Sequence, residues 1–464
     1  MSLPFLKNIS NSALLSITVS GIAVICGSFA AYLYFTLKST WQRTGLLFFS
    51  LIVFSISPAI YLVALTRYEI FNLLPVFLQI VIVLTINMSP LPFAILVFTA
   101  GTITQSSLDV AFLSAHPGQV YRKIILPQLS FPLMISGLII FMLVFKHHEV
   151  PSFLGYRTYS EELLNRIVVM SDPQHASIAS LPFLALGSLI VSLLIWMISK
   201  SHLLNLVETY CLPLSLIFRE KKTILLFSVF SAIFAFPVIF FKTFKYIDFS
   251  SLHTILIENI REIQNSLSLA VVSALIGTIA ACYLYTFFKR INSRLLSLLG
   301  VAILLFYWLT PSSLIDLGLI EMVQLFKVNS IALDILALLF GYQTNLLPIA
   351  LFILCALQLI KKDQDNTILK ELGISNYNIF TKIIFPQNWP IWLITATILS
   401  VFALNDLSTT VLLIPPGIET VVIKIYNLMH YGDYSLVGIL SLVQVFLVST
   451  LVLFTAGVIS LRKT

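Results

Sequence analysis

The chain has 464 residues, of which 58% are hydrophobic and 10% are charged, and its formal net charge is +7. A soluble domain has about 25% charged residues, and no soluble fold of this size could bury so much apolar surface. We therefore exclude a soluble enzyme and a nucleic-acid-binding protein, and we expect a polytopic protein embedded in a lipid bilayer. The four cysteines form no Cys-x-x-Cys pair, so they indicate neither a disulfide framework nor a zinc site, and we expect no cofactor.

Apolar stretches long enough to cross a membrane, about 20 residues each, predict eleven transmembrane helices in an all-α fold. The first stretch is too long for the core of a signal peptide. The third and the ninth are over-long and contain prolines, so we expect each to be one broken or kinked span. The expected spans are 12–37, 44–66, 71–106, 129–146, 178–199, 223–242, 265–288, 295–316, 331–360, 388–410 and 434–461.

The linkers expected on the two sides of the membrane differ in their content of charged residues. Those expected on the same side as the C-terminus hold 17 of the 27 Lys and Arg residues, but 6 of the 20 Asp and Glu residues. Because basic residues accumulate in cytoplasmic loops, this side is predicted to be cytoplasmic. With an odd number of spans, the N-terminus is then outside and the C-terminus inside.

The sequence resembles itself at a spacing of about 255 residues. One period contains six helices, an even number, so both copies would have the same orientation, unlike the inverted repeats of many secondary transporters. We expect two parallel halves, 1–200 and 265–464, joined by a linker, 201–264, that holds the extra helix 223–242. The matched positions are Asn11-Ser12 with Asn265-Ser266, Gly27 with Gly277, Pro58 with Pro311, Pro92 with Pro348, segment 123–128 with 382–387, and Glu149 with Asp406.

Each half has a cytoplasmic segment of about 20 residues before its fourth helix, at 108–128 and at 367–387. In the second, Gly373 is suited to end one short helix, because glycine adopts positive φ without strain. Pro386 is suited to the first turn of the next helix. The segment therefore predicts a helix–turn–helix that lies along the membrane surface.

The spacing from Gly373 to Pro386, Gly-x9-Ile-x-Phe-Pro, resembles the "EAA" loop of permeases in binding-protein-dependent ABC importers. Helix order and repeat extend the resemblance over nearly the whole chain, which looks most like the fused two-half permeases of the ferric-iron, thiamine and polyamine group. Leu108 and Thr367 stand where the family has glutamate, and Ser114 where it has glycine. The residues that the resemblance assigns to the two loops are Asp109, Ser114, Gly118, Ile124, Leu126 and Pro127, and Thr367, Glu371, Gly373, Ile383, Phe385 and Pro386.

The resemblance implies the type I ABC importer fold, in the plasma (inner) membrane of a bacterium. It implies that the two loops insert into two copies of a cytoplasmic ABC ATPase, and that a substrate-binding protein delivers cargo from outside. No Gly-x4-Gly-Lys-Ser/Thr motif is present, so ATP hydrolysis is expected on a separate chain and this chain is not expected to be an enzyme. Segments 412–420 and 425–432 look most like the iron members, which makes ferric iron the first expected cargo and thiamine or a polyamine the alternative.

Two acidic residues, Glu149 and Asp406, fall near the outer ends of spans, where a charge is costly if it lies within the bilayer. They are either contacts of the pore or the binding protein, or interfacial acids. His147 and His148 lie beside Glu149. Imidazole is a poor sole ligand for hard ferric iron, so we expect these histidines at the surface and no metal site.

The pairs Gly27-x3-Ala31 and Gly277-x3-Ala281 place small residues one helical turn apart, which permits close helix packing. Two other classes of function stay open. A secondary transporter would be expected to carry intramembrane charges on several helices, and such charges are scarce in this sequence. A membrane-embedded enzyme would need a catalytic set such as His-Glu-x-x-His or paired intramembrane aspartates, and the sequence contains neither.

Overall fold

The computed structural model of the chain describes residues 3–37, 40–100, 113, 119, 126–168, 173–200, 252–290, 294–325, 330–358, 385–431 and 434–460. These residues form helices and connecting turns, and no strand occurs among them. The expected sixth span, 223–242, lies outside the described residues, as do the two N-terminal and four C-terminal residues.

Six helices in the described part of the chain are long and apolar enough to cross a membrane, and eight spans result if each of two bent helix pairs counts as one. The protein is therefore an all-α, polytopic membrane protein. The expected number was eleven. Of the other three expected spans, 44–66 is broken into two short helices, 129–146 is a shorter apolar helix, and 223–242 is not described.

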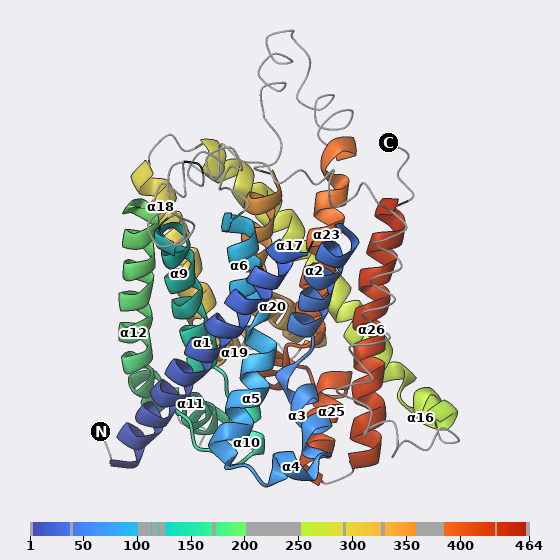
Figure 1. Ribbon diagram of the computed structural model, residues 1–464. Coiled ribbons are helices and arrows are strands. Elements are labelled where there is room, and N and C mark those ends of the chain that lie inside the picture. Colours follow the sequence, from blue (N-terminus) through green and yellow to red (C-terminus); the bar gives the residue numbers. More distant parts are fainter. Residues whose placement is uncertain are drawn as a thin grey trace.

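The helices are arranged as an upright bundle, with the N-terminal helix starting at one end and the C-terminal helix finishing at the other (Figure 1). The first group is α1 (Leu3–Thr36), α2 (Thr40–Ser55), α3 (Pro58–Thr66), α4 (Glu69–Asn72), α5 (Val76–Met88), α6 (Pro90–Ala100), α9 (Leu126–Phe145), α10 (Glu149–Phe153), α11 (Tyr159–Val168) and α12 (Pro173–Lys200). The second group is α16 (Leu252–Glu258), α17 (Ile260–Arg290), α18 (Arg294–Leu309), α19 (Ser312–Leu325), α20 (Ile331–Gln358), α23 (Phe385–Leu404), α24 (Leu407–Leu413), α25 (Val421–Tyr431) and α26 (Tyr434–Ser460).

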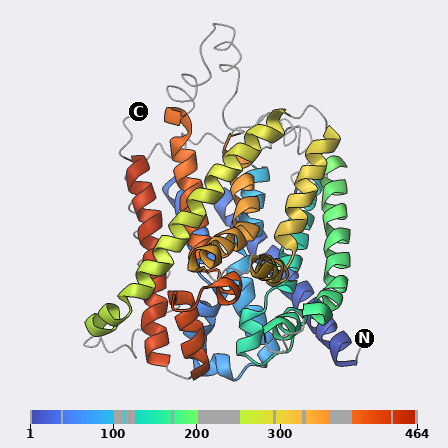
Figure 2. The ribbon, with the colours of Figure 1, turned by 180° about the vertical axis from the view of Figure 1, so that it is seen from behind.

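Two long helices cross opposite faces of the bundle obliquely. Helix α1, with 34 residues, runs across the front in Figure 1, and α17, with 31 residues, runs across the front in Figure 2. Helix α1 packs on α6 and α9, and α17 packs in the same way on α20 and α23. The two groups also pack on each other: α12 of the first group contacts α18 of the second, and α26 of the second group contacts α3 of the first.

The four helices that end each group have similar lengths in the same order. Helices α9, α10, α11 and α12 have 20, 5, 10 and 28 residues. Helices α23, α24, α25 and α26 have 20, 7, 11 and 27 residues. In each set, a long helix is followed by two short helices at the lower end of the bundle and by another long helix that returns to the upper end (Figure 1).

Three helix breaks, at Pro58, Pro311 and Asp406, shape the interior of the bundle. Pro58 begins α3 after α2 ends, and Pro311 stands between α18 and α19, so these two prolines mark corresponding breaks. The axes bend by 92° between α18 and α19 and by 64° between α23 and α24. The spans expected at 295–316 and 388–410 are therefore not straight, because a new helix starts directly after Pro311 and another directly after Asp406.

The two over-long spans behave differently from each other. The third is broken at Ser89, between α5 and α6, but together these helices still form one candidate span, as expected. The ninth, α20, continues through Pro348 as one helix.

The small-residue pairs do mark close helix packing, as predicted. A Cβ atom added to Gly27 would lie 2.5 Å from Cγ of Pro92 and 2.8 Å from the backbone nitrogen of Phe93. One added to Gly277 would lie 2.8 Å from Oε1 of Gln343 and 3.1 Å from Cδ1 of Leu399. Glycine therefore brings α1 against α6, and α17 against α20 and α23.

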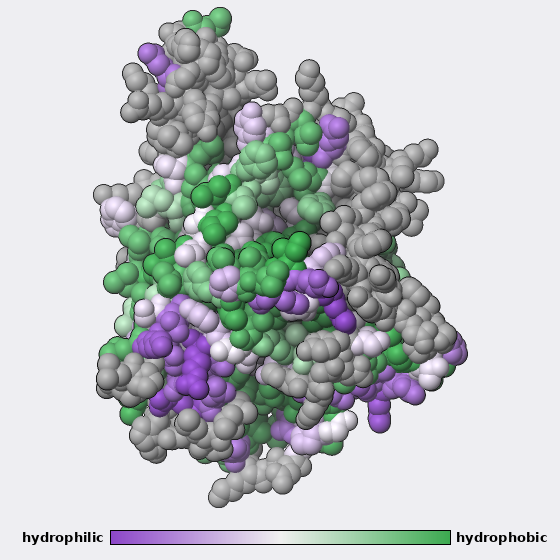
Figure 3. All heavy atoms as spheres, turned by 60° about the horizontal axis from the view of Figure 1, so that its bottom comes forward, coloured by the Kyte–Doolittle hydropathy of each residue, from purple (hydrophilic) through white to green (hydrophobic). Residues whose placement is uncertain are grey.

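The flanks of the bundle expose large apolar side chains, which a bilayer would cover. On α1, Ile25 and Phe29 are 68% and 62% exposed, and on α17, Ile279 and Tyr283 are 69% and 73% exposed. Viewed with the lower end forward, hydrophilic side chains gather in separate patches between hydrophobic areas (Figure 3). Polar side chains therefore reach the surface at this end of the bundle.

Candidate functional site

Most residues that the resemblance assigns to the coupling loops lie outside the described part of the chain. The exceptions stand at the first turns of two helices: Leu126 and Pro127 in α9, and Phe385 and Pro386 in α23. Helices α9 and α23 both start at the upper end of the bundle (Figure 1). Outside the described residues are Asp109, Ser114, Gly118, Ile124, Thr367, Glu371, Gly373 and Ile383.

The described residues most suited to a function form a polar connection between the two groups of helices. Lys146 follows the last residue of α9, and its Nζ donates hydrogen bonds to the backbone oxygen of Trp308 (2.7 Å) and to Oδ1 of Asn345 (3.1 Å). Nδ2 of Asn345 donates to Oδ2 of Asp406 at 3.0 Å. We call these three side chains, Lys146, Asn345 and Asp406, the polar bridge. It joins the ends of α9 and α18 to the middle of α20 and the start of α24.

The break after α18 explains why Lys146 finds a partner there. In a continuous helix, the backbone oxygen of Trp308 would accept the N–H four residues later, but the chain turns away at Pro311. Lysine side chains commonly bond such freed carbonyls at helix C-termini. At the corresponding break after α2, Nδ2 of Asn87 donates a hydrogen bond to the freed backbone oxygen of Ile56 at 2.8 Å.

Asp406 has a clear local role. It is the N-cap of α24, and its Oδ1 accepts a hydrogen bond from the backbone N–H of Thr409 at 3.1 Å. This contact satisfies one of the free N–H groups at the helix start. Asp406 thus stands at a helix break in the bundle, rather than within a continuous span.

Glu149 was matched with Asp406 in the sequence, but the structure shifts this match by one residue. The N-cap of α10 is His148, and Glu149 is the first residue of the helix. Glu149 is 6% exposed, so it is buried at the start of α10. It is not one of the three residues of the polar bridge.

A cavity of about 140 Å³ adjoins the polar bridge. His148, expected at the surface, is 8% exposed and lines this cavity, so that expectation was wrong for His148. The chain after α9 turns inward, which places the imidazole beside the break after α18. The lining residues are Met88, Leu143, Lys146, His147, His148, Pro311, Ser312, Ser313, Asn345 and Ser408.

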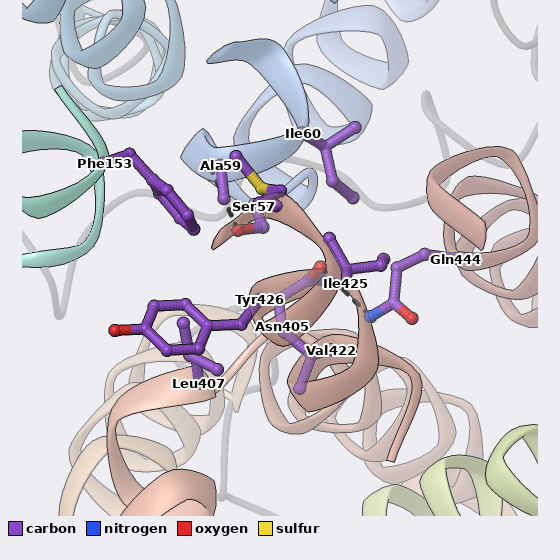
Figure 4. A pocket seen from close by; sticks show the side chains of 11 residues that line it. Ser57, Ala59, Ile60, Phe153, Asn405, Leu407, Val422, Ile425, Tyr426 and Gln444 are labelled. Atoms are coloured by element: carbon purple, nitrogen blue, oxygen red, sulfur yellow. Dashed lines mark hydrogen bonds between the residues drawn. The ribbon is translucent and has the colours of Figure 1, made fainter. Parts of the chain in front are cut away.

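A second, smaller hollow lies between α3, α10 and the helices α24 to α26 (Figure 4). Its volume of about 10 Å³ is close to that of a single water site. Phe153, Leu407 and Tyr426 are among the apolar side chains of its wall, and Ser57 and Gln444 are among the polar ones (Figure 4). This hollow is too small for a cargo molecule, so the cavity at the polar bridge is the stronger candidate.

Sequence reasoning missed three ionisable or amide residues that matter here. Lys146 was counted only as a charge at a span end, and Asn345 and the fully buried Asp316 were not singled out. The available signal was their position inside or at the end of apolar stretches, where polar side chains are costly and tend to be functional. Among the described residues, no group of three or more His, Cys, Asp or Glu is arranged to hold a metal ion.

The sequence matches no protein-family model, and no curated protein matches it significantly.

Proposed function

We propose that the protein is the membrane-spanning permease of an ATP-driven importer that depends on a substrate-binding protein. One observation carries the proposal. The two segments with the loop motif each precede a 20-residue helix, α9 or α23, and both helices start at the same end of the bundle (Figure 1). A single partner on that side could therefore engage both segments.

The proposal includes two parallel halves, with eleven spans in the type I importer arrangement. Three facts support it: the repeated order of helix lengths, the matching prolines at the breaks, and the exchange of neighbours between α12–α18 and α26–α3. Such an exchange is expected when two halves are related by an axis along the membrane normal. Alternating access would then be a rigid-body motion of one half against the other.

Ferric iron is the first proposed cargo, on the likeness of segments 412–420 and 425–432 to iron permeases, and thiamine or a polyamine is the alternative. Two copies of an ABC ATPase and an external binding protein are the proposed partners. The bacterial inner membrane is the proposed location, with the N-terminus outside and the C-terminus in the cytoplasm.

The coupling assignment can be tested by uptake. Gly373→Pro should abolish uptake of radioactive ferric iron in cells, while the amount of inserted protein stays unchanged, because proline prevents the turn that glycine permits. Ser375→Ala, which alters only a side chain in the same segment, is the matched control. Wild-type uptake by Gly373→Pro would contradict the assignment. The same assay with thiamine and spermidine distinguishes the cargoes.

One observation favours a second candidate, a proton-coupled secondary transporter. Lys146, Glu149, Asp316 and Asp406 bring ionisable groups from four helical elements into the bundle, as such transporters often do. A protonophore that stops uptake while cellular ATP stays constant would favour this candidate. Loss of uptake on ATP depletion with an intact proton gradient would favour the importer.

A further inference from the structure

The cavity at the polar bridge is lined by side chains that still have hydrogen-bond donors to offer. An ammonium group has three N–H donors, and Lys146 uses two of them, on Trp308 and Asn345. Ser312 and Ser313 are 7% and 6% exposed, and no hydrogen bond joins their hydroxyl groups to another described residue. These groups are removed from bulk solvent but open to the cavity.

The start of α19 contributes further donors. This helix has 14 residues and begins at Ser312, directly after the 92° bend. The first N–H groups of a helix have no partner within it, and the helix dipole makes this end attractive to anions. Because Pro311, Ser312 and Ser313 all line the cavity, the positive end of α19 faces it.

Two imidazoles, those of His147 and His148, complete the lining, and no carboxylate does so. His148 is 8% exposed, and its side chain has no hydrogen bond to another described residue. Asp316, Asp406 and Glu149 lie nearby but do not line the cavity. A lysine, a helix N-terminus and buried hydroxyls around one space form a set of donors that suits a negatively charged oxygen group.

We propose that this cavity binds an oxyanion, a carboxylate or phosphate group, on the transport path. The inference rests on the proposed permease function, and it specifies that the species transported across the membrane includes an oxyanion. The volume of about 140 Å³ exceeds the 10–15 Å³ needed for one water, so it holds a small oxyanion with some hydration. The oxyanion is part of the cargo itself or an inorganic anion that crosses with it. Because no carboxylate lines the cavity, a cationic cargo such as ferric iron would cross together with this anion.

Direct binding tests this inference without any partner. The purified full chain in lipid nanodiscs is dialysed against radioactive inorganic phosphate and, separately, radioactive acetate. We expect saturable binding of at least one of them. Lys146→Met should weaken that binding at least tenfold, and the double variant Ser312→Ala with Ser313→Ala should weaken it several-fold. Lys146→Arg should keep it, because the charge and the donors remain.

Lys7→Met, the same chemical change at an exposed position of α1, is the matched control and should bind like the wild type. Binding of phosphate identifies a free inorganic anion, and binding of acetate alone identifies a carboxylate of an organic cargo. No saturable binding of either anion to the wild type would overturn the proposal. Equal binding by Lys146→Met and the wild type would also overturn it. The assay contains no ATPase, so its result is separate from the test of the importer function.

Discussion

The hydroxyl of Ser12, in α1, accepts a hydrogen bond of 2.8 Å from the backbone N–H of Tyr159, the first residue of α11. The second group of helices repeats this contact, because Ser266 in α17 accepts a 2.8 Å bond from the N–H of Val421, the first residue of α25. The preceding asparagines repeat as well: Asn11 donates to the backbone oxygen of Arg157 at 3.0 Å, and Asn265 donates to that of Glu419 at 3.1 Å. An Asn-Ser pair on each long helix thus fixes the start of a short helix far along the chain.

The repeated contact predicts equal effects of two substitutions. Ser12→Ala and Ser266→Ala should each lower stability by about 1 kcal/mol, since each leaves a buried backbone N–H without its acceptor. Ser20→Ala is the control, because its hydroxyl bonds only within α1 and is exposed. Thermal unfolding of the purified protein in detergent measures the effect. An unchanged midpoint for Ser12→Ala or Ser266→Ala would contradict this role.

Much of the fold could be predicted from the sequence because it depends on local composition. The long apolar stretches at α12 and α26 predict spans, and the Asn-Ser pairs and the prolines at 58 and 311 mark corresponding positions. The sequence could not predict the 92° bend at Pro311, because membrane helices also continue through proline, as α20 does at Pro348.

The polar bridge was harder to predict than the fold. The main partner of Lys146 is a backbone oxygen, that of Trp308, and a backbone oxygen leaves no mark in the sequence. The bond exists only because the helix breaks and because two segments 162 residues apart meet. The inward position of His148 has the same cause, since it depends on the turn that follows α9.

A glycine on α1 offers a sharp test of close packing. Gly27→Ala should lower stability by about 1–3 kcal/mol, because the new Cβ would lie 2.5 Å from Pro92 and 2.8 Å from the backbone of Phe93. The control is Gly21→Ala on the same helix, where nothing lies within 4 Å of the new atom. Alanine should stabilise the helix there by up to about 1 kcal/mol. Thermal midpoints that move in the same direction for both variants would refute the packing of α1 on α6.

The polar bridge predicts a strong effect at its central residue. Asn345→Leu removes one acceptor from Lys146 and one donor from Asp406, and both groups would stay in the bundle. Stability should fall by about 1–3 kcal/mol or more, because unpaired charged groups are costly in a protein interior. Asn72→Leu should have little effect, because the side chain of Asn72 is exposed and donates only to the solvent-exposed backbone oxygen of Thr66, at 2.8 Å. Comparable unfolding midpoints for the two variants would rule out a structural role of the polar bridge.

The charge distribution predicts which end of the bundle faces the cytoplasm. In a variant with all four cysteines changed to serine, Glu69→Cys in α4 should react with a membrane-impermeant maleimide on intact cells. Leu113, in the first coupling loop (108–128), is 89% exposed, and Leu113→Cys should react only after the membrane is permeabilised. The opposite pattern would invert the proposed topology.

The central claim is that two cytoplasmic loops of this chain engage an ABC ATPase. Purification of the tagged protein from native membranes in mild detergent, with partners identified by mass spectrometry, tests it most directly. We expect an ABC ATPase at about two copies per chain, which is lost or reduced in Gly373→Pro but kept in Ser375→Ala. If no ATPase is recovered, even after crosslinking through cysteines placed at Ser114 and Gly373, the importer assignment is contradicted and the secondary transporter becomes the better account.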